Sequence, residues 1–328
     1  MNYCLYKLSF TSPLHAGTGE MAKGLDTARM TLCADTLFSA LCHTILKKEG
    51  LSSMSEFCRR AAAGKLLFSD TMPYRKESLY IPKPYISPSV KREGDSSADN
   101  RKAMKKMAHI PVSSLPAFFA SLRGKGEYDA LKNRGLFAAS SISAKNTIDA
   151  AEGATPYSVG LWHFAGNCGL YFILGFEEEE DCDWLSNILT TLGSGGVGGK
   201  VSAGYGKFVL ADDPIFLDAP FDDDTNILSK MLSDEKADIY ISLTTSLPAD
   251  GELDHALEGA SYGVTRRGGF VYSENFSERL VKKQTQYFLS AGSTFTRRYS
   301  GELFNVAPNG KHPVFRYGKP IFLGAERL

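Results

Sequence analysis

Polar and apolar residues alternate from Asn2 to Thr11, which predicts a β-strand with one buried face. Apolar residues then recur at helical spacing over 36–48. Asp35 stands where an N-cap would lie, and Gly50 follows where the helix should end. Before Pro82 the sequence also predicts a helix near 54–63 and strands near 65–68 and 78–81.

The pattern weakens from Pro82 to about Pro116, where prolines bracket a polar and basic stretch. Regular patterns resume at about residue 161. Up to residue 211 they predict strands over 161–164, 170–176 and 207–211, a helix over 181–192 and a glycine-rich run over 193–206. An acidic, irregular segment follows over 212–236, and beyond it the patterns predict strands over 239–245, 269–272, 285–289 and 314–323 and a helix over 253–257.

This order predicts an α+β protein that passes twice through a βαββ-type layout. We therefore expect two tandem ferredoxin-like (RRM-like) domains with a basic hairpin insertion and a glycine-rich loop. The expected boundaries are 1–211 for the first domain, 212–236 for an acidic connection and 237–328 for the second domain. The insertion covers about 83–111.

Composition narrows the class of protein further. The 328 residues are 43% hydrophobic, and no stretch approaches the roughly 18–20 apolar residues of a membrane span. The alternating N-terminus is unlike a signal peptide, so we expect a cytoplasmic protein without membrane partners. Six cysteines without a CxxC pair and six histidines without HxxxH or HExxH spacing predict reduced packing residues, no metal and no cofactor.

The formal net charge is zero, but the charges are segregated along the chain. Residues 83–145 hold twelve Lys and Arg against five Asp and Glu, and residues 251–328 hold eleven against seven. Residues 171–238 hold only four against fifteen. Such segregation predicts a basic face for a polyanion and an acidic face that repels it, although an uneven solvated surface would give the same counts.

The glycine-rich run over 193–206 is the most informative segment. It contains GxGxxG, but it follows a helix and precedes a strand, the reverse of a dinucleotide-binding site. The Gly199-Lys200 pair is followed by Val201, which also excludes a P-loop. Unshielded amides beside lysine and tyrosine favour binding to a phosphate chain over a flexible surface loop.

This loop resembles the G-loop of the RAMP superfamily of CRISPR proteins. The segments Tyr6–Gly17 and Ala34–Leu41, and Ile81–Pro84 followed by the Lys- and Met-rich stretch up to Pro111, look like those of the fourth subunit of type III-A (Csm) effector complexes. The likeness covers about residues 1–210 and continues more weakly to the end. One departure is that 146–149 is followed by Ala150-Ala151 and not by an arginine.

The resemblance implies a non-catalytic RNA-binding subunit that holds the 5′ handle of the crRNA and takes part in antiviral defence. It also implies a thumb-like hairpin that meets the guide–target duplex, which we place in the basic insertion. The implied partners are crRNA, target RNA, the large polymerase/cyclase-type subunit and an adjacent backbone RAMP subunit. The alternatives are a metal-independent endoribonuclease that uses His15 and a protein-only scaffold.

The candidate RNA-binding residues come from four parts of the chain. Those in the second domain could equally make surface or subunit contacts, and Met104 and Met107 are expected to pack the insertion. The candidates are His15 and Gly17; Lys83, Lys91, Arg92, Arg101, Lys102, Lys105 and Lys106; Gly195, Gly196, Gly198, Gly199, Lys200, Ser202, Gly204, Tyr205, Gly206 and Lys207; and Arg266 and Arg267.

Overall fold

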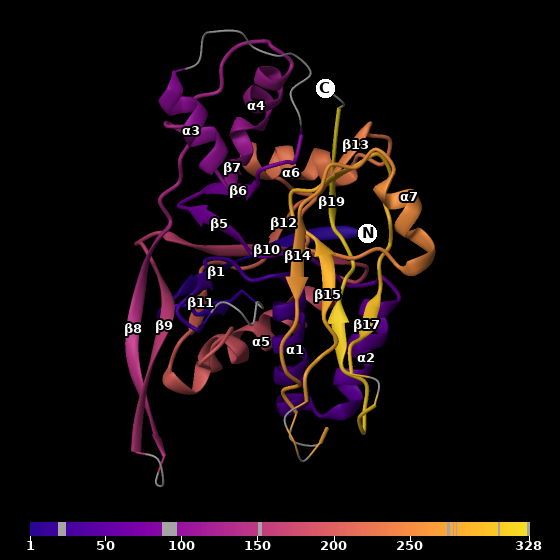
Figure 1. Ribbon diagram of the computed structural model, residues 1–328. Coiled ribbons are helices and arrows are strands. Elements are labelled where there is room, and N and C mark those ends of the chain that lie inside the picture. Colours follow the sequence, from indigo (N-terminus) through magenta and orange to yellow (C-terminus); the bar gives the residue numbers. More distant parts are fainter. Residues whose placement is uncertain are drawn as a thin grey trace.

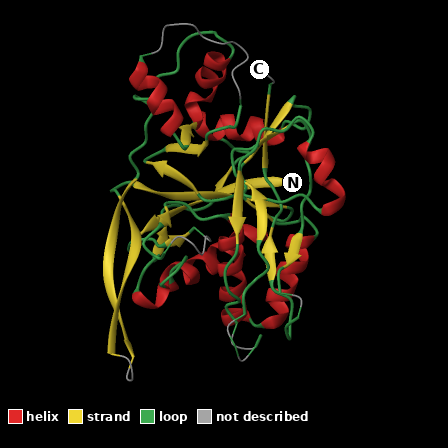
Figure 2. Ribbon diagram, in the orientation of Figure 1, coloured by secondary structure: helices red, strands yellow, loops and turns green. Residues whose placement is uncertain are grey.

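The computed structural model describes residues 1–18, 24–86, 97–149, 153–273, 276–277, 279, 281–307 and 309–326. It is a mixture of helix and sheet, which confirms the α+β class (Figure 2). Among these residues, no helix is both long enough and apolar enough to cross a membrane.

The centre of the molecule is one large antiparallel sheet in the order β11-β1-β10-β5-β6-β7, to which β12 adds beside β1 and β4 beside β10. The two central strands pair along almost their full length, from Asn2 opposite Phe176 to Leu8 opposite Leu170. The strands are β1 (Asn2–Phe10), β4 (Leu67–Phe68), β5 (Met72–Arg75), β6 (Ser78–Pro82), β7 (His109–Pro111), β10 (Cys168–Phe176), β11 (Phe208–Leu210) and β12 (Ile215–Phe216).

Both faces of this sheet are buried. Cys4, Tyr6 and Leu8 of β1 face one core, and Leu5 faces the other. The prediction of one buried face for β1 was therefore wrong. A lysine in a strand usually marks an exposed face, but Lys7 is only 5% exposed because its ammonium is paired with Glu77.

Helices cover the sheet on its two sides (Figure 1). The first core lies under α1, α2 and α5, and the second is closed by α4, α6 and strands from the end of the chain. Because both halves of the chain contribute to the second core, they share one interior. The helices are α1 (Ala34–Glu49), α2 (Leu51–Ala62), α3 (Ala98–Lys106), α4 (Leu115–Leu122), α5 (Glu180–Gly195), α6 (Asp223–Ser233) and α7 (Leu253–Leu257), with short 3₁₀ turns η1 (Val112–Ser114), η2 (Val201–Ala203) and η3 (Asp250–Glu252).

The segment over 212–236 is more regular than its composition indicates. β12 joins the large sheet, and α6 is capped by Asp222, whose carboxylate accepts a 2.7 Å hydrogen bond from the Thr225 amide. Leu228 and Leu232 then bury one face of the helix. The acidic residues that looked like a linker serve partly as an N-cap and a favourable first helical turn.

The end of the chain forms a small sheet in the order β16-β13-β19 and two strand pairs, β14-β15 and β17-β18. The strand expected over 269–272 lies earlier, at 264–267, and the one expected over 314–323 is split in two. The bounds are β13 (Ile239–Ser242), β14 (Val264–Arg267), β15 (Gln286–Leu289), β16 (Thr294–Phe295), β17 (Leu303–Asn305), β18 (Phe315–Tyr317) and β19 (Phe322–Ala325).

A long two-stranded ribbon, β8 (Ala138–Asp149) and β9 (Gly153–Phe164), projects from the body (Figure 1). The sequence predicted the hairpin over 83–111, of which 87–96 lie outside the described residues. The described part of that segment holds α3, which lies against the body, and β7, which pairs with β6. Residues Lys91 and Arg92 lie outside the described residues.

Candidate nucleic-acid interface

The glycine-rich loop starts later than predicted, because α5 continues to Gly195. Gly193 and Gly195 are therefore helical. A side chain on Gly193 would lie 2.3 Å from the carbonyl oxygen of Phe208, so this glycine lets α5 approach β11. Gly195 has no atom within 4 Å of the place of a Cβ. The loop proper thus covers 196–206, and we call this segment the G-loop.

The G-loop is held by its own main chain. Gly196, Gly198, Gly204 and Gly206 have positive φ, and so does Lys200 at 58°. A Cβ on Gly206 would lie only 1.9 Å from the carbonyl oxygen of Val197. Such positions exclude side chains, which explains the density of glycine by conformation and close packing.

Many of the amides that we expected to be free are already bonded. The amide of Gly199 donates to the His15 carbonyl at 2.8 Å, and that of Gly206 donates to the Pro13 carbonyl at 2.8 Å. The amides of Gly196 and Gly204 also donate within the chain. A phosphate can therefore use fewer main-chain donors than the sequence predicts, and side chains must carry more of any contact.

His15 is a buried support of this loop. Its Nδ1 donates a 2.7 Å hydrogen bond to the carbonyl of Gly160 in β9, and its own carbonyl accepts from Gly199. Gly17 lies next to it in the short strand β2 (Ala16–Gly17), which pairs with β3 (Ala28–Arg29). His15 thus joins the G-loop to the base of the ribbon, and its burial sets it apart from the exposed RNA-binding candidates.

Two lysines and two tyrosines lie where the ribbon meets the G-loop. The ammonium of Lys200 lies 4.5 Å from the centre of the Tyr157 ring, and that of Lys145 lies 5.4 Å from the centre of the Tyr205 ring. Lys145 and Tyr157 are directly opposite one another in the β8-β9 ladder. We call these four residues the cation–aromatic cluster; their contacts hold two positive charges in place.

Tyr205 differs from the free stacking ring that the sequence indicated. It is 9% exposed and packs on Val159 and Leu161 of β9. The neighbouring Lys145 side chain lowers the pKa of the Tyr205 hydroxyl. The half-buried Tyr157 is the more accessible ring. Neither Tyr157 nor Lys145 was predicted from the sequence, because a ribbon with much of both faces exposed has no periodic apolar signal.

A groove of about 880 Å³ lies beside the G-loop. One wall is the end of α5 and the loop from Gly195 to Ser202, and the other is α1 with residues of the last part of the chain. Its charged lining is mostly positive, with Asp35 as the acidic residue and six cations, namely Lys47, Lys48, Lys200, Arg267, Lys283 and Arg316.

Arg267 fixes the far wall of the groove. Its guanidinium makes two hydrogen bonds to Asp35, at 2.6 and 2.9 Å, and a third to Thr36. Asp35 is therefore an ion-pair partner, and α1 has no side-chain cap at Cys33, contrary to the predicted N-cap role. Burial alone would raise the pKa of Asp35, but attraction to Arg267 and Arg316 holds it below the ordinary value.

Arg266 and Arg267 were both predicted to bind RNA. Arg267 lines the groove, whereas Arg266 does not. Lys207 is exposed after the loop, with its main chain bonded to Thr11 and Ser12. Ser202 is exposed in η2. Both are free to reach a ligand from the side of the G-loop.

The basic residues of the predicted insertion form a separate patch. Arg101, Lys102, Lys105 and Lys106 are exposed on α3, while Met107 is buried and Met104 is half-buried against the second core, as expected for packing residues. The ammonium of Lys83 donates a 2.7 Å hydrogen bond to the Met104 carbonyl, and burial lowers its pKa. Figure 1 places α3 at the opposite end of the molecule from α5.

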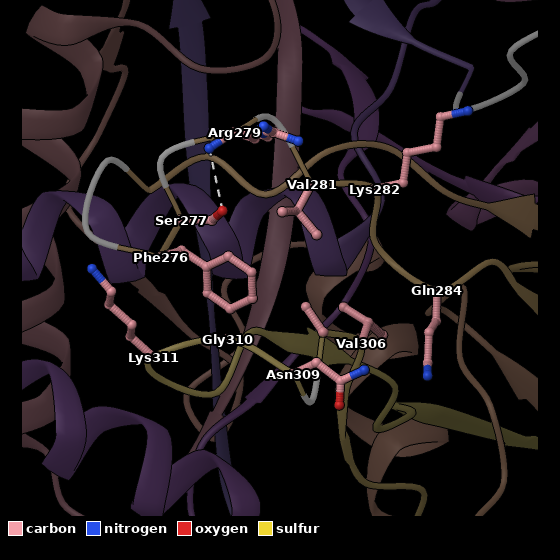
Figure 3. Close-up of a pocket in the computed structure, with 11 residues that line it drawn as sticks. Phe276, Ser277, Arg279, Val281, Lys282, Gln284, Val306, Asn309, Gly310 and Lys311 are labelled. Atoms are coloured by element: carbon pink, nitrogen blue, oxygen red, sulfur yellow. Dashed lines mark hydrogen bonds between the residues drawn. The ribbon is translucent and has the colours of Figure 1, made fainter.

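A second cavity, of about 810 Å³, lies among loops near the end of the chain (Figure 3). Phe276, Val281 and Val306 form its apolar floor, and Lys282 and Lys311 stand at its sides. The two lysines point away from one another, so they do not converge on one anion. Within the described residues, no three His, Cys, Asp or Glu side chains are grouped as metal ligands.

Solved structures with the same fold include chains of two assemblies that contain a Csm4 protein. One is a chain of the Csm3–Csm4 subcomplex of the type III-A complex, 15% identical, with both chains covered completely and a TM-score of 0.64. Another is a chain of the Csm1–Csm4 cassette in complex with cA4, 17% identical over 99% of this chain and 98% of that one, with a TM-score of 0.62. The chain thus shares its fold with these chains over nearly its whole length.

Sequence comparison gives the family. The Csm4 protein of Mycobacterium tuberculosis (strain ATCC 25618 / H37Rv) is 32% identical over 98% of both chains, and that of Streptococcus thermophilus is 29% identical over 99% of this chain and all of the other. The family model of the CRISPR Csm4 C-terminal domain matches residues 235–325. The chain belongs to the Csm4 family of CRISPR proteins, which confirms the resemblance seen in the sequence.

Proposed function

We propose that this chain is a non-catalytic RNA-binding subunit of a type III-A CRISPR ribonucleoprotein, which holds the 5′ handle of the crRNA and docks on the large polymerase/cyclase-type subunit. Family membership supports this, as do the named assemblies of similar structures, which contain Csm1 or Csm3. A Csm1-type subunit is then the large partner, and a Csm3-type subunit is the neighbouring RAMP protein.

The tandem ferredoxin-like arrangement is part of this proposal. In the first half, the order β11-β1-β10-β5 with α1 and α5 in the connections supports a ferredoxin-like unit. In the second half, β19-β13-β16 repeats three of the four strand positions. Between β16 and β19 the described residues form the pair β17-β18 in place of a helix.

The cation–aromatic cluster is the observation that carries the proposal. Stacking on Tyr157 and Tyr205 holds Lys145 and Lys200 at the junction of ribbon, G-loop and groove. Cations fixed in this way lose little side-chain freedom when they contact phosphates, and RNA-binding surfaces combine positive charge with aromatic rings. The handle would lie along the groove, in contact with the cluster.

The ribbon supplies a second contact in this proposal. It projects from the body, and Ile142 is largely exposed on β8. An apolar side chain on a projecting hairpin can insert between base steps of a duplex. We assign the thumb-like role to β8-β9 in place of the insertion over 83–111, with the guide–target duplex as its partner.

The test is the salt dependence of binding by the purified full chain. A fluorescent RNA with the repeat-derived handle should bind, and a scrambled RNA of the same length should bind more weakly. If about four phosphates are contacted, log Kd should change with log salt with a slope of about 3 in magnitude. Absence of binding, or binding that salt does not change, would contradict the proposal.

The non-catalytic part is tested with longer repeat RNA. We expect the RNA to remain intact with the wild-type chain. His15→Ala should weaken RNA binding, because the G-loop loses the support of the imidazole. Cleavage by the wild type that disappears in His15→Ala would favour the endoribonuclease and overturn this part of the proposal.

A further inference from the structure

Tyr272 stands at the groove with its ring largely in solvent. Its side chain is 74% exposed, and it lines the groove from the side opposite the G-loop. The ring of His43 in α1 packs perpendicular to it, with ring centres 5.3 Å apart and planes at 83°. One perpendicular neighbour covers at most one face of the tyrosine ring, so His43 leaves at least the other face available to a planar ligand.

The side chains around this ring favour an anion. Lys283 also lines the groove, and the pKa of its ammonium is lowered by burial and by the nearby Arg316. Arg316 is 4% exposed, and its Nη2 has no hydrogen-bond partner among the described residues. Lys47 and Lys48 line the same groove in the last turn of α1.

A planar ring next to concentrated positive charge matches the two parts of a nucleotide. The base offers a face for stacking, and the phosphate offers charge for lysine and arginine. The groove volume of about 880 Å³ lies within the range of ordinary ligand sites, which is roughly 300–1,000 Å³. The G-loop on the opposite wall connects this position with the cation–aromatic cluster.

We propose that Tyr272 stacks on one base of the bound RNA while Lys283 contacts the adjacent phosphate. This inference rests on the proposed function and deepens it, since it assigns a base-contacting residue to the last part of the chain. Both halves of the chain then contact the same RNA strand. The far wall is kept in place by the Arg267–Asp35 ion pair.

The test uses the full chain and handle RNA that carries 2-aminopurine at one position at a time, since stacking quenches this base. Tyr272→Leu should weaken binding about tenfold and remove the quenching at one position. Tyr272→Phe keeps the ring face and should behave like the wild type. Tyr287→Leu is the matched control, because Tyr287 is 62% exposed but lies outside the groove.

Lys283→Met tests the phosphate contact separately. It should reduce the salt slope by about 0.7, the amount for one contact with a single strand, and leave the quenching in place. An unchanged slope would overturn the role of Lys283. Melting temperatures close to the wild-type value would show that each variant is folded.

The outcomes separate this inference from the proposed function. If the wild type does not bind handle RNA, the proposed function itself is wrong. If the wild type binds and Tyr272→Leu binds equally well with unchanged quenching, only the base-stacking inference is wrong. If Tyr272→Leu retains RNA but loses a purified Csm1-type subunit, the ring belongs to a protein interface, which also overturns the inference.

Discussion

The G-loop side and the α3 patch are both basic in sequence, but they differ in structure. At the G-loop, Lys200 lies on a tyrosine ring and the main chain is fixed by bonds to His15 and Pro13. On α3, four cations stand exposed on one short helix, and none is in an ion pair within the described part of the chain. Figure 1 shows α3 and α5, the helix that leads into the G-loop, on opposite sides of the large sheet.

Positive charge alone therefore does not define a binding site. Mobile lysines attract RNA from solution but lose side-chain entropy when they are fixed. Lysines that are already held in place lose less side-chain entropy when they bind RNA. A neighbouring groove also lets the surface fit the shape of the RNA strand. We therefore expect the G-loop side to determine affinity and α3 to add long-range attraction.

The largest effect should come from Gly206→Ala. A Cβ at this position would lie 1.9 Å from the Val197 carbonyl oxygen, and φ is 75°. The G-loop must rearrange, so RNA binding should be lost and the melting temperature should fall. Fluorescence anisotropy and thermal unfolding measure the two effects. Gly251→Ala is the control, because Gly251 has open space at the place of a Cβ and lies outside the groove; an equally strong loss there would contradict our account of the loop.

Arg267→Gln should have the next largest effect, on stability. Removal of one partner of a buried ion pair costs about 3–5 kcal/mol, and we expect the lower end because Arg316 remains near Asp35. Urea unfolding measures the loss, and Arg266→Gln is the matched neighbour that should change little. Equal losses in both variants would show that the ion pair does not hold the groove wall.

The same pair predicts a pH dependence. The pKa of Asp35 is lower in the folded chain than in the unfolded one, where it is about 3.9. The ion pair therefore stabilises the folded chain fully when the pH is above the pKa of Asp35 in the unfolded chain. This stabilisation is lost as the pH falls through the lowered pKa of the folded chain. The deficit of Arg267→Gln relative to the wild type should be largest near pH 7 and should shrink toward pH 3. A constant deficit in urea unfolding would contradict this sign.

Lys145→Gln with Lys200→Gln should weaken RNA binding about tenfold without unfolding the chain. Two lost phosphate contacts should also reduce the salt slope by about 1.4. Anisotropy titrations between low and high salt give both numbers. A change in affinity with an unchanged slope would mean that the lysines act through Tyr157 and Tyr205 and not through phosphates.

The triple variant Lys102→Gln, Lys105→Gln and Lys106→Gln should have the smallest effect, about two- to threefold at low salt and less at physiological salt. These side chains are exposed, so salt screens their attraction. The same titrations test this. A loss larger than that of the Lys145 and Lys200 variant would reverse the comparison.

Regular, one-sided patterns in the sequence predicted elements well. The opening strand, the first two helices, the helix over 253–257 and the helix before the glycine-rich run are all present. In the longer helices the apolar residues recur at a fixed period because one face is buried. The opening strand was found in the right place although both of its faces are buried. The glycine spacing also led to the correct family, since positive φ and close approach require glycine itself.

The ribbon could not be predicted in the same way. Its strands are rich in Ser, Thr and Ala, and much of both faces is exposed, so no alternation marks them. The ion pair between Arg267 and Asp35 joins residues more than 200 positions apart, and nothing local indicates it. The sequence predicted free amides in the G-loop, but several of them donate hydrogen bonds within the chain. Composition does not show which acceptors surround a loop.

Photo-crosslinking tests the central comparison most directly. Handle RNA with 4-thiouridine at successive positions would be crosslinked to the full chain, and the modified peptides would be identified by mass spectrometry. We predict crosslinks within 143–159 of the ribbon and 197–207 of the G-loop. Crosslinks confined to α3, between 98 and 106, would contradict the account.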